Sequence, residues 1–290
     1  MGTIPQDHVV CNLCGGNDLA PWARRAEVPV VRCLSCGLVY TSPRPAADLL
    51  RSRYQGVYVD LHQDEGLLKQ RRLMYGQERR EILRRAAGGR FLDVGCGTGE
   101  FLALMADRFE VHGLDVSEPY IEYGRDRLGL ANLHIGELHE VGLPDAYYDV
   151  VQMRGVLQHL SDPLAAVREA LRVTRPGGLL VVSATPNIAS ICARLYRDRF
   201  RLLAPEFMLY NFSPATLREL LERAGWDVEQ IVYPYLLTPY FRWWHGLQVL
   251  SDAVWMALER VPGVPSFDRS SPAFFGSMMT CYARKPYVAR

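Results

Sequence analysis

The stretch that most constrains this chain is residues 91–99, which read Phe-Leu-Asp-Val-Gly-Cys-Gly-Thr-Gly. An apolar run ends at the acid Asp93, glycine then recurs at every second position, and apolar residues at helical spacing follow from Phe101. This order predicts a strand, a glycine turn and a helix, in which the backbone can approach a ligand closely. A second acid, Asp115, ends another apolar run twenty residues after Gly95, a distance that suits the hydroxyls of a ribose.

The spacing of the glycines separates this turn from that of dinucleotide-binding proteins. Those proteins use G-x-G-x-x-G, which places a pyrophosphate on the helix N-terminus. Here Gly99 comes one residue earlier, and Asp93 stands two residues before Gly95. A tight turn in an unrelated α/β protein is the alternative, and the linked strand, helix and second acid argue against it.

From Arg90 onward the pattern alternates between strand and helix. Ser213 and Pro214 predict the start of one further helix, which should end at Ala224. Strands are expected at 90–95, 110–115, 132–136, 147–153, 178–184, 227–233 and 274–284, and other helices at 99–108, 117–129 and 162–174. This alternation predicts an α/β fold with a doubly wound, Rossmann-like sheet of seven strands.

Four of the seven cysteines form two C-x-x-C pairs with eighteen residues between them. This spacing is typical of a four-cysteine zinc ribbon, and a glycine follows each pair. Two chance pairs or a redox dithiol are the alternatives. The predicted zinc ligands are Cys11, Cys14, Cys33 and Cys36. Loss of the zinc is expected to loosen residues 1–45 and to leave the core folded.

Composition sets the broad class of the protein. Of 290 residues, 49% are hydrophobic, which is enough for a sizeable core. With 33 basic and 32 acidic residues the net charge is +1, so no general attraction to nucleic acid or anionic membrane is expected. No stretch approaches ~18 apolar residues, and residues 1–10 lack the features of a signal peptide. We therefore expect a cytoplasmic enzyme without a transmembrane segment.

The expected domain organisation has three parts. Residues 1–42 form the zinc ribbon, residues 43–87 a helical linker and active-site cover, and residues 88–290 the main domain with a helical lid insertion at about 190–262. Within the insertion, residues 235–262 are rich in aromatic and apolar side chains. Packing against the sheet is the preferred interpretation of that segment, ahead of a substrate lid, a dimer face or a membrane-surface helix.

Residues 88–185 resemble the core of the class I S-adenosylmethionine-dependent methyltransferases along their whole length, from the glycine turn to the turn at Arg175-Pro176-Gly177-Gly178. The ribbon and the Pro-Arg-Pro of residues 43–45 resemble a bacterial branch whose members often act on small molecules or sugars, in natural-product or envelope pathways. The resemblance implies S-adenosylmethionine as cofactor. The residues implied to hold it are Asp93, Gly95, Cys96, Gly97, Asp115, Val116, Glu137, Leu138 and Met153.

Methyl transfer is an in-line displacement, and a base is needed only where the acceptor must lose a proton. His159, just past the fourth strand, is the candidate base, and packing against the next helix is its alternative role. Relatives carry Pro-Glu-His before the late Phe-Ser helix start, whereas here Glu206 is followed by Phe207. Glu206 and Tyr210 are candidates for residues that line the acceptor site. The alternative is that both are ordinary residues of a mobile lid.

These observations favour methyl transfer to oxygen or carbon of a small-molecule acceptor of natural-product or sugar type. An RNA methyltransferase that binds RNA through its ribbon is one alternative, but residues 1–42 contain three arginines and no lysine, so nucleic acid is not the expected partner. A protein of the same fold that binds the cofactor for other chemistry is another. A decayed, non-catalytic core is a third, and the intact Asp93, Gly95, Gly97 and Asp115 argue against it.

Overall fold

The computed structural model describes residues 6–45, 65–234, 243–259, 261–272 and 274–287. A seven-stranded sheet runs through the molecule in the order β12-β13-β10-β9-β6-β7-β8. Its strands are β6 (Gly89–Val94), β7 (Phe109–Asp115), β8 (Leu133–Ile135), β9 (Tyr148–Arg154), β10 (Thr174–Pro186), β12 (Asp227–Val232) and β13 (Met278–Arg284). β13 is antiparallel to both neighbours, whereas β10, β9, β6, β7 and β8 pair in parallel. The predicted doubly wound sheet is confirmed.

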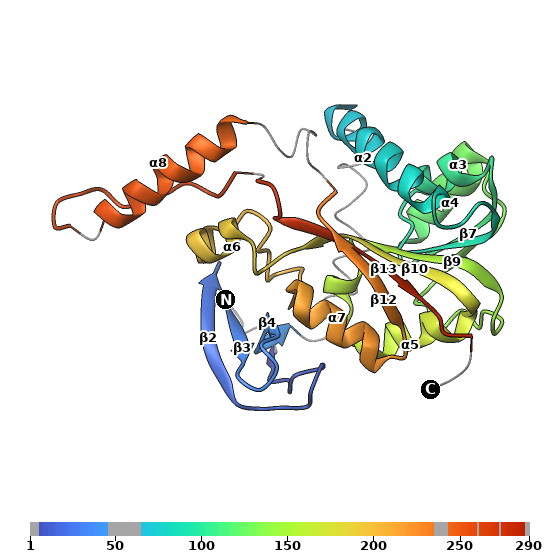
Figure 1. Ribbon diagram of the computed structural model, residues 1–290, viewed down its shortest axis with the longest axis horizontal. Helices are drawn as coiled ribbons and strands as arrows, with labels where there is room; N and C mark the ends of the chain where they lie inside the picture. The colour runs from blue at the N-terminus through green and yellow to red at the C-terminus, as the bar shows by residue number, and fades with distance from the viewer. Residues whose placement is uncertain (1–5, 46–64, 235–242, 260, 273, 288–290) are drawn as a thin grey trace.

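Helices cover both faces of this sheet, as Figure 1 shows. On one face lie α2 (Glu65–Leu83), α3 (Glu100–Met105) and α4 (Glu118–Leu128), and on the other α5 (Pro163–Val173) and α7 (Pro214–Arg223). Each face has its own apolar core, built on alternate residues of the same strands because successive strand side chains point to opposite faces. Thus Phe91 packs toward α3, and the next residue, Leu92, packs toward α5 and α7.

Local signals in the sequence set the starts of two helices. The Asp162 carboxylate accepts a hydrogen bond from the Ala165 amide and caps α5, as its position before a proline predicts. Ser213 and Thr216 form a reciprocal capping box at the start of α7. Both helices are thereby fixed against the sheet that supports the site.

The N-terminal region forms a second sheet that crosses the predicted boundary at residue 42. Strands β2 (Leu19–Arg25), β3 (Val28–Cys33) and β4 (Val39–Thr41) are joined by β11 (Tyr210–Asn211), which comes from the main domain. β5 (Arg44–Pro45) pairs with β1 (Gln6–Asp7), so the end of the expected linker is part of a two-stranded sheet. The three-part division remains a prediction, but ribbon and main domain share strand pairing.

The expected insertion holds α6 (Ile191–Tyr196), the short helix η3 (Arg197–Arg199) and α8 (Trp244–Leu258). Figure 1 shows α8 standing out from the body of the molecule. Val249 is buried, but most of its large apolar side chains face outward, so our interpretation of residues 235–262 as core packing is wrong for most of the part that the structure describes. Residues 235–242 and the expected helix across 46–64 lie outside the described residues.

Candidate cofactor site and metal centre

The carboxyl ends of four neighbouring strands bring the predicted cofactor residues to one edge of the sheet. Asp93 lies next to the end of β6, followed by the glycine turn, and Asp115 ends β7. Gly95 has φ +70°, and a Cβ atom there would come within 2.4 Å of the Val156 side chain. A larger residue would therefore block both the turn and the approach of the loop after β9.

The Asp115 carboxylate joins the two loops of this edge. Its Oδ2 accepts a hydrogen bond from the Gly97 amide, and its Oδ1 accepts one from the Ser117 amide, both at 2.9 Å. The side chain is half-buried, so its oxygens also face the edge where a ligand would lie. Asp115 can thus fix the glycine turn and accept further hydrogen bonds from hydroxyl groups.

Asp93 is in a very different environment. It is 2% exposed, and its Oδ1 is buried without a hydrogen-bond partner among the described residues. Burial raises the pKa of the Asp93 carboxyl to about 8, the neighbouring carboxylates of Glu78 and Asp115 act in the same direction, and Arg154 opposes them. A buried carboxyl of this kind suits a cationic group that would restore its charged form.

One charged group close to Asp93 is not among the residues predicted from the sequence. Arg154, at the end of β9, forms an ion pair of 2.9 Å with Glu78 of α2, which is 2% exposed, and its guanidinium lies 4.7 Å from the centre of the Tyr75 ring. These contacts hold α2 over the edge of the sheet. A charged residue at the carboxyl end of a buried strand was the available signal, but its partner lies 76 residues earlier.

The other predicted cofactor residues differ in what they can offer. Glu137 and Val116 are half-buried after β8 and β7, so their side chains can reach a ligand at this edge. Met153 and Leu138 are buried in the core on the α5 face, which leaves mainly their backbone groups for binding. Cys96 is 9% exposed inside the turn.

His159 lies in a short helix, η2 (Leu157–His159), that follows β9. Its Nδ1 is 2.9 Å from the Phe207 carbonyl oxygen, which can only accept, so Nδ1 carries the proton. The lone pair of the neutral ring is therefore on Nε2. Burial lowers the pKa of His159, and the bond to Phe207 partly offsets this.

The two acceptor-side candidates are placed differently. Tyr210 is 2% exposed, and its hydroxyl donates to the Ser161 carbonyl at 3.2 Å and accepts from Arg44 at 3.1 Å. It thus joins Arg44, which comes just after the expected ribbon, to the main domain. Glu206 is half-buried in the turn that presents the Phe207 carbonyl to His159.

The four ribbon cysteines meet in a compact cluster. Their Sγ atoms all lie within 4.8 Å of one another, with Cys11 and Cys36 at 3.4 Å and Cys14 and Cys33 at 3.6 Å. Zn–S bonds of about 2.3 Å in a tetrahedron put sulfurs roughly 3.8 Å apart, so the cluster fits this ion.

The two halves of the cluster repeat the same backbone hairpin. The Gly15 amide donates to the Cys11 carbonyl at 2.8 Å, and the Gly37 amide donates to the Cys33 carbonyl at 2.9 Å. Both glycines have positive φ, +73° and +79°, which a residue with a side chain rarely adopts. The glycines after each C-x-x-C pair therefore close the hairpins that aim the sulfurs at a common point.

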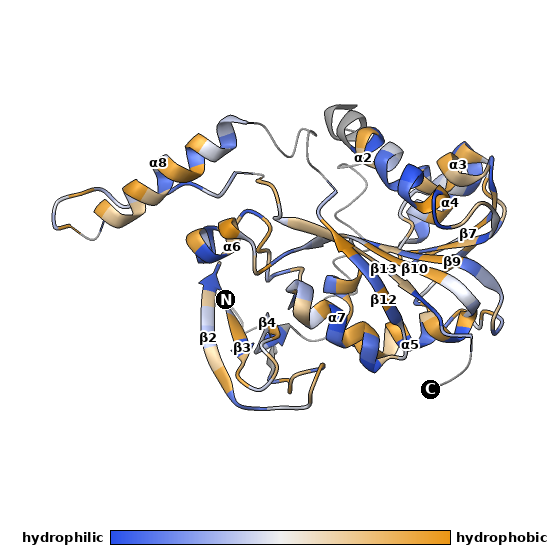
Figure 2. Ribbon diagram, in the orientation of Figure 1, coloured by the Kyte–Doolittle hydropathy of each residue, from blue (hydrophilic) through white to orange (hydrophobic). Residues whose placement is uncertain are grey.

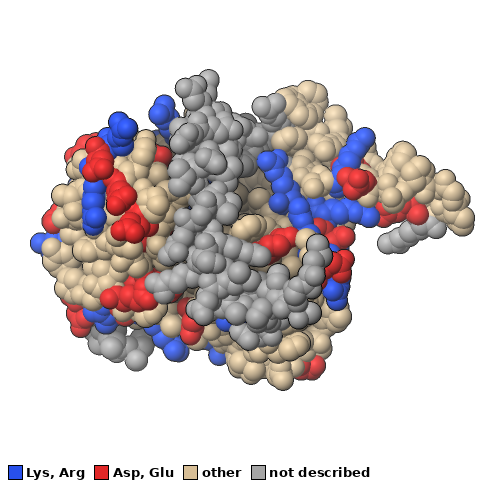
Figure 3. Space-filling model, turned by 180° about the vertical axis from the view of Figure 1, so that it is seen from behind, with Lys and Arg blue, Asp and Glu red and all other residues tan. Residues whose placement is uncertain are grey.

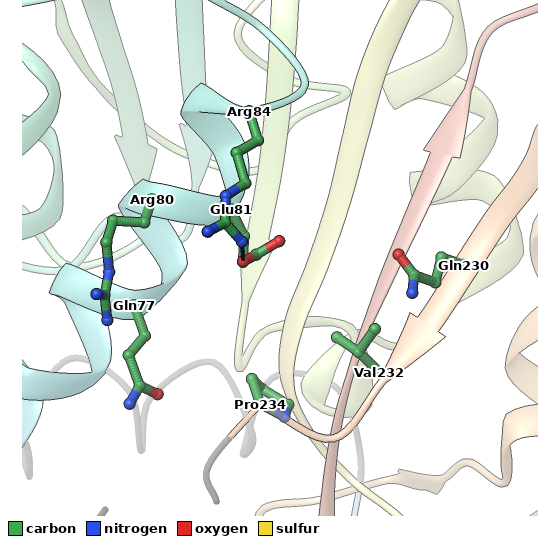
Figure 4. A pocket seen from close by; sticks show the side chains of 7 residues that line it. All are labelled: Gln77, Arg80, Glu81, Arg84, Gln230, Val232 and Pro234. Atoms are coloured by element: carbon green, nitrogen blue, oxygen red, sulfur yellow. Dashed lines mark hydrogen bonds and ion pairs between the residues drawn. The ribbon is translucent and has the colours of Figure 1, made fainter.

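A pocket of about 400 Å³ lies apart from these residues, between α2 and β12 (Figure 4). None of the predicted site residues lines it. Its lining residues are Gln77, Arg80, Glu81, Arg84, Gln230, Val232 and Pro234.

Comparison with known proteins identifies the family. The model of a family described as "Methyltransferase domain" matches residues 67–231, which is more than half of the chain. The chain belongs to this family. Among solved structures, a S-adenosylmethionine-dependent methyltransferase of Thermotoga maritima superposes with a TM-score of 0.53 at 20% identity, over 82% of this chain and 99% of that chain. At this identity the likeness shows the fold alone.

Two curated relatives agree with the family. A probable S-adenosylmethionine-dependent methyltransferase of Mycolicibacterium smegmatis is 40% identical over 149 residues, covering 51% of this chain and 56% of that protein. A demethylmenaquinone methyltransferase of Listeria welshimeri is 32% identical over 142 residues, covering 45% and 60%. The chain thus spans a little over half the length of the curated relatives it matches.

Proposed function

We propose that this protein transfers a methyl group from S-adenosylmethionine to a small-molecule acceptor. The observation that carries the proposal is the carboxyl edge of β6 and β7, where Asp93, the Gly95–Gly97 turn and Asp115 are arranged in a chain of the methyltransferase family. S-adenosylmethionine supplies the electrophilic methyl group. The protein then has to bind and orient the cofactor and the acceptor and to exclude water, which is the largest part of catalysis for such a displacement.

The residues of the site divide this work between them. Asp115 is suited to accept hydrogen bonds from ribose hydroxyls, because its carboxylate is already fixed by two backbone amides. The buried oxygen of Asp93 is suited to the cationic amino-acid end of the cofactor. The Glu78–Arg154 pair anchors α2 over this edge, so the helix helps to exclude water.

His159 is the proposed base for an acceptor that must lose a proton. Its Nδ1–H is held by the Phe207 carbonyl, which fixes the ring and leaves Nε2 as the basic atom. A lowered pKa keeps the imidazole neutral near pH 7, the form that can accept a proton. An acceptor that is already nucleophilic would leave His159 with a packing role only.

We propose that zinc is structural and that the acceptor is not RNA. Four thiolates close the coordination shell, so the ion has no position for a substrate. Cys11 and Cys33 are buried in the core of the main domain, which supports a role in holding the ribbon rather than in recognition.

No described helix is long and apolar enough to cross a membrane. Methyl transfer to an oxygen or carbon atom of a natural-product or sugar acceptor is also part of this proposal.

Calorimetric titration with S-adenosylhomocysteine, the demethylated product, tests the proposal directly. We expect one site per chain with micromolar or tighter affinity, and elemental analysis should find one zinc per chain. Methyl-labelled cofactor offered with panels of hydroxylated small molecules and with total RNA should label the small-molecule fraction. Absence of binding would overturn the proposed cofactor, and labelled RNA would overturn the proposed acceptor class.

A further inference from the structure

The outer face of α8 is a stripe of large apolar side chains that the described part of the molecule leaves exposed. They recur at three- and four-residue steps, so they lie along one side of the helix and its flanks. Between 43% and 74% of each is exposed. The stripe consists of Trp243, Trp244, Leu247, Leu250, Val254, Trp255, Leu258 and Val261, and is called the α8 stripe below.

The opposite side of α8 fixes the helix to the body of the protein. Asp252 is 2% exposed and accepts a hydrogen bond of 2.6 Å from the Tyr196 hydroxyl of α6. Glu259, next to the end of the helix, accepts a bond of 2.7 Å from the Phe267 amide, and Val249 packs into the apolar cluster around α6. These contacts set the rotation of the helix about its axis. The outward orientation of the α8 stripe is therefore fixed by the fold.

The α8 stripe carries no charge. Between residues 244 and 258 the sequence has no Lys, Arg or Glu, and its one Asp is the buried Asp252. Figure 2 shows orange bands along the helix, separated by pale and blue ones, and in Figure 3 the projecting end seen from behind is mostly free of charged side chains. Exposed Ser251 and Ala257 lie between the large side chains, where their small size permits close helix approach.

The size of the stripe exceeds what a monomer usually exposes. From the exposed fractions, its eight side chains present on the order of 1,000 Å² to solvent, whereas the largest apolar patch of a monomeric protein is roughly 300–600 Å². A stable protein–protein interface needs about 800 Å² from each partner. The exposed area of the stripe is therefore of the same order as the area that each partner of a stable dimer buries.

We infer that α8 of one copy packs against α8 of a second copy of this chain, with the two stripes antiparallel about a two-fold axis near Ser251. A two-fold axis pairs the stripe with the same stripe of the second copy. Because the stripe is neutral, no like charges face each other, so the surface is complementary to itself. The helix is a poor fit to an anionic membrane surface, where an in-plane helix carries Lys or Arg on its polar face. None is present between residues 244 and 258. The dimer is independent of the proposed methyl transfer.

Sedimentation velocity of the full chain at micromolar concentration is the test. We expect a species of about twice 32.8 kDa for the wild type. Leu250→Glu combined with Val254→Glu should convert it to a monomer while the titration with S-adenosylhomocysteine is unchanged. Leu104→Glu combined with Tyr123→Glu, two exposed sites on α3 and α4, should leave the dimer intact.

A second measurement tests the dimer without depending on the folding of the double Glu variant. Ser251→Cys should give a crosslinked dimer with a short bismaleimide, and the wild type should not. A wild-type monomer at micromolar concentration, or a Ser251→Cys chain that fails to crosslink, overturns the inference. Flotation of the wild type with phosphatidylcholine–phosphatidylglycerol vesicles, abolished by the double Glu variant, would assign the stripe to a membrane instead.

Discussion

At the scale of single residues, two acids at the ends of adjacent strands differ in exposure and in hydrogen bonding. The Asp115 carboxylate accepts two backbone amides and remains half-exposed, whereas Asp93 is enclosed and has an oxygen without a partner among the described residues. Burial of Asp93 favours the neutral form of its carboxyl. In the proposed function, the same residue type serves two parts of one ligand, the ribose and the amino-acid end.

Asp115→Ala should weaken binding of S-adenosylhomocysteine by about 1–3 kcal/mol, which is roughly 5- to 150-fold. The substitution removes the proposed ribose partner and also frees the Gly97 and Ser117 amides. Calorimetry measures the loss, and Glu118→Ala, an exposed neighbour in the first turn of α4, serves as the matched control. Equal affinities for the two variants would remove Asp115 from the site.

Asp93 should make the stability of the cofactor-free protein depend on pH. Its pKa is about 8 in the folded chain and about 4 when unfolded, so the folded chain binds the extra proton between these values. Its stabilising effect is complete below about pH 4 and is lost as the pH rises through about 8. Urea unfolding should show the wild type losing roughly 2 kcal/mol between pH 6 and 8, relative to Asp93→Asn. Parallel pH profiles of the two proteins would contradict the assignment.

His159→Asn separates the two roles of this side chain. The asparagine amide can still donate to the Phe207 carbonyl, but it cannot take a proton. We expect turnover to fall by about 100-fold with cofactor affinity unchanged, and wild-type turnover to decline with falling pH at a value below 6.5. His139→Ala, at an exposed site, is the control. Near wild-type turnover in His159→Asn would leave the histidine a packing role.

At the scale of elements, α2 is the part that connects the sheet edge with the surrounding cover. One of its faces presents Glu78 to Arg154 and Tyr75 to the Phe101 ring. Two residues after the helix ends, Arg85 lies 3.9 Å from the centre of the Tyr282 ring. The helix is thus attached by contacts to distant elements, in addition to the packing of Tyr75 and Ile82 in the apolar core. The buried ion pair among them is the most sensitive to substitution, because removing one partner leaves an uncompensated charge.

Glu78→Ala should lower the free energy of unfolding by about 3–5 kcal/mol, because it removes the buried carboxylate that pairs with the half-buried Arg154. Glu81→Ala, which breaks surface pairs with Arg84 and Arg85 one turn away, should cost less than about 1 kcal/mol. Urea unfolding compares the two. Adding Arg154→Met to Glu78→Ala should restore part of the loss, and a double variant no more stable than Glu78→Ala would argue against a charge effect.

At the scale of the whole molecule, ribbon and main domain behave as parts of one core. Strand β11 adds to the ribbon sheet, and Leu13 and Tyr40 share an apolar cluster with α5 and α7. The Asn12 amide also donates to the Asp162 carboxylate at 2.9 Å. The cysteine hairpins thus support α5, which follows the loop that carries His159.

This shared core changes what we expect from removal of zinc. The sequence suggested that residues 1–45 would loosen alone, whereas the structure leads us to expect a lower melting temperature for the entire chain, in one cooperative transition. Calorimetric melting with and without a chelator measures this, and Cys33→Ser should reproduce the chelated curve. Two separate transitions, with the upper one unmoved by the chelator, would show that the ribbon is independent.

The sequence by itself determined the order of strands and helices, the caps at Asp162 and Ser213, the glycine turn with its two acids, and the four cysteines that meet in the ribbon. Each of these depends on spacing within a short stretch, or on the rule that carboxyl ends of parallel strands share an edge. Only the tertiary structure decided that β11 pairs with β4, that Glu78 meets Arg154, and which way the α8 stripe faces. Partners 76 or more residues apart are chosen by packing of whole elements, and an apolar helical stripe has the same pattern whether a core or a second molecule covers it.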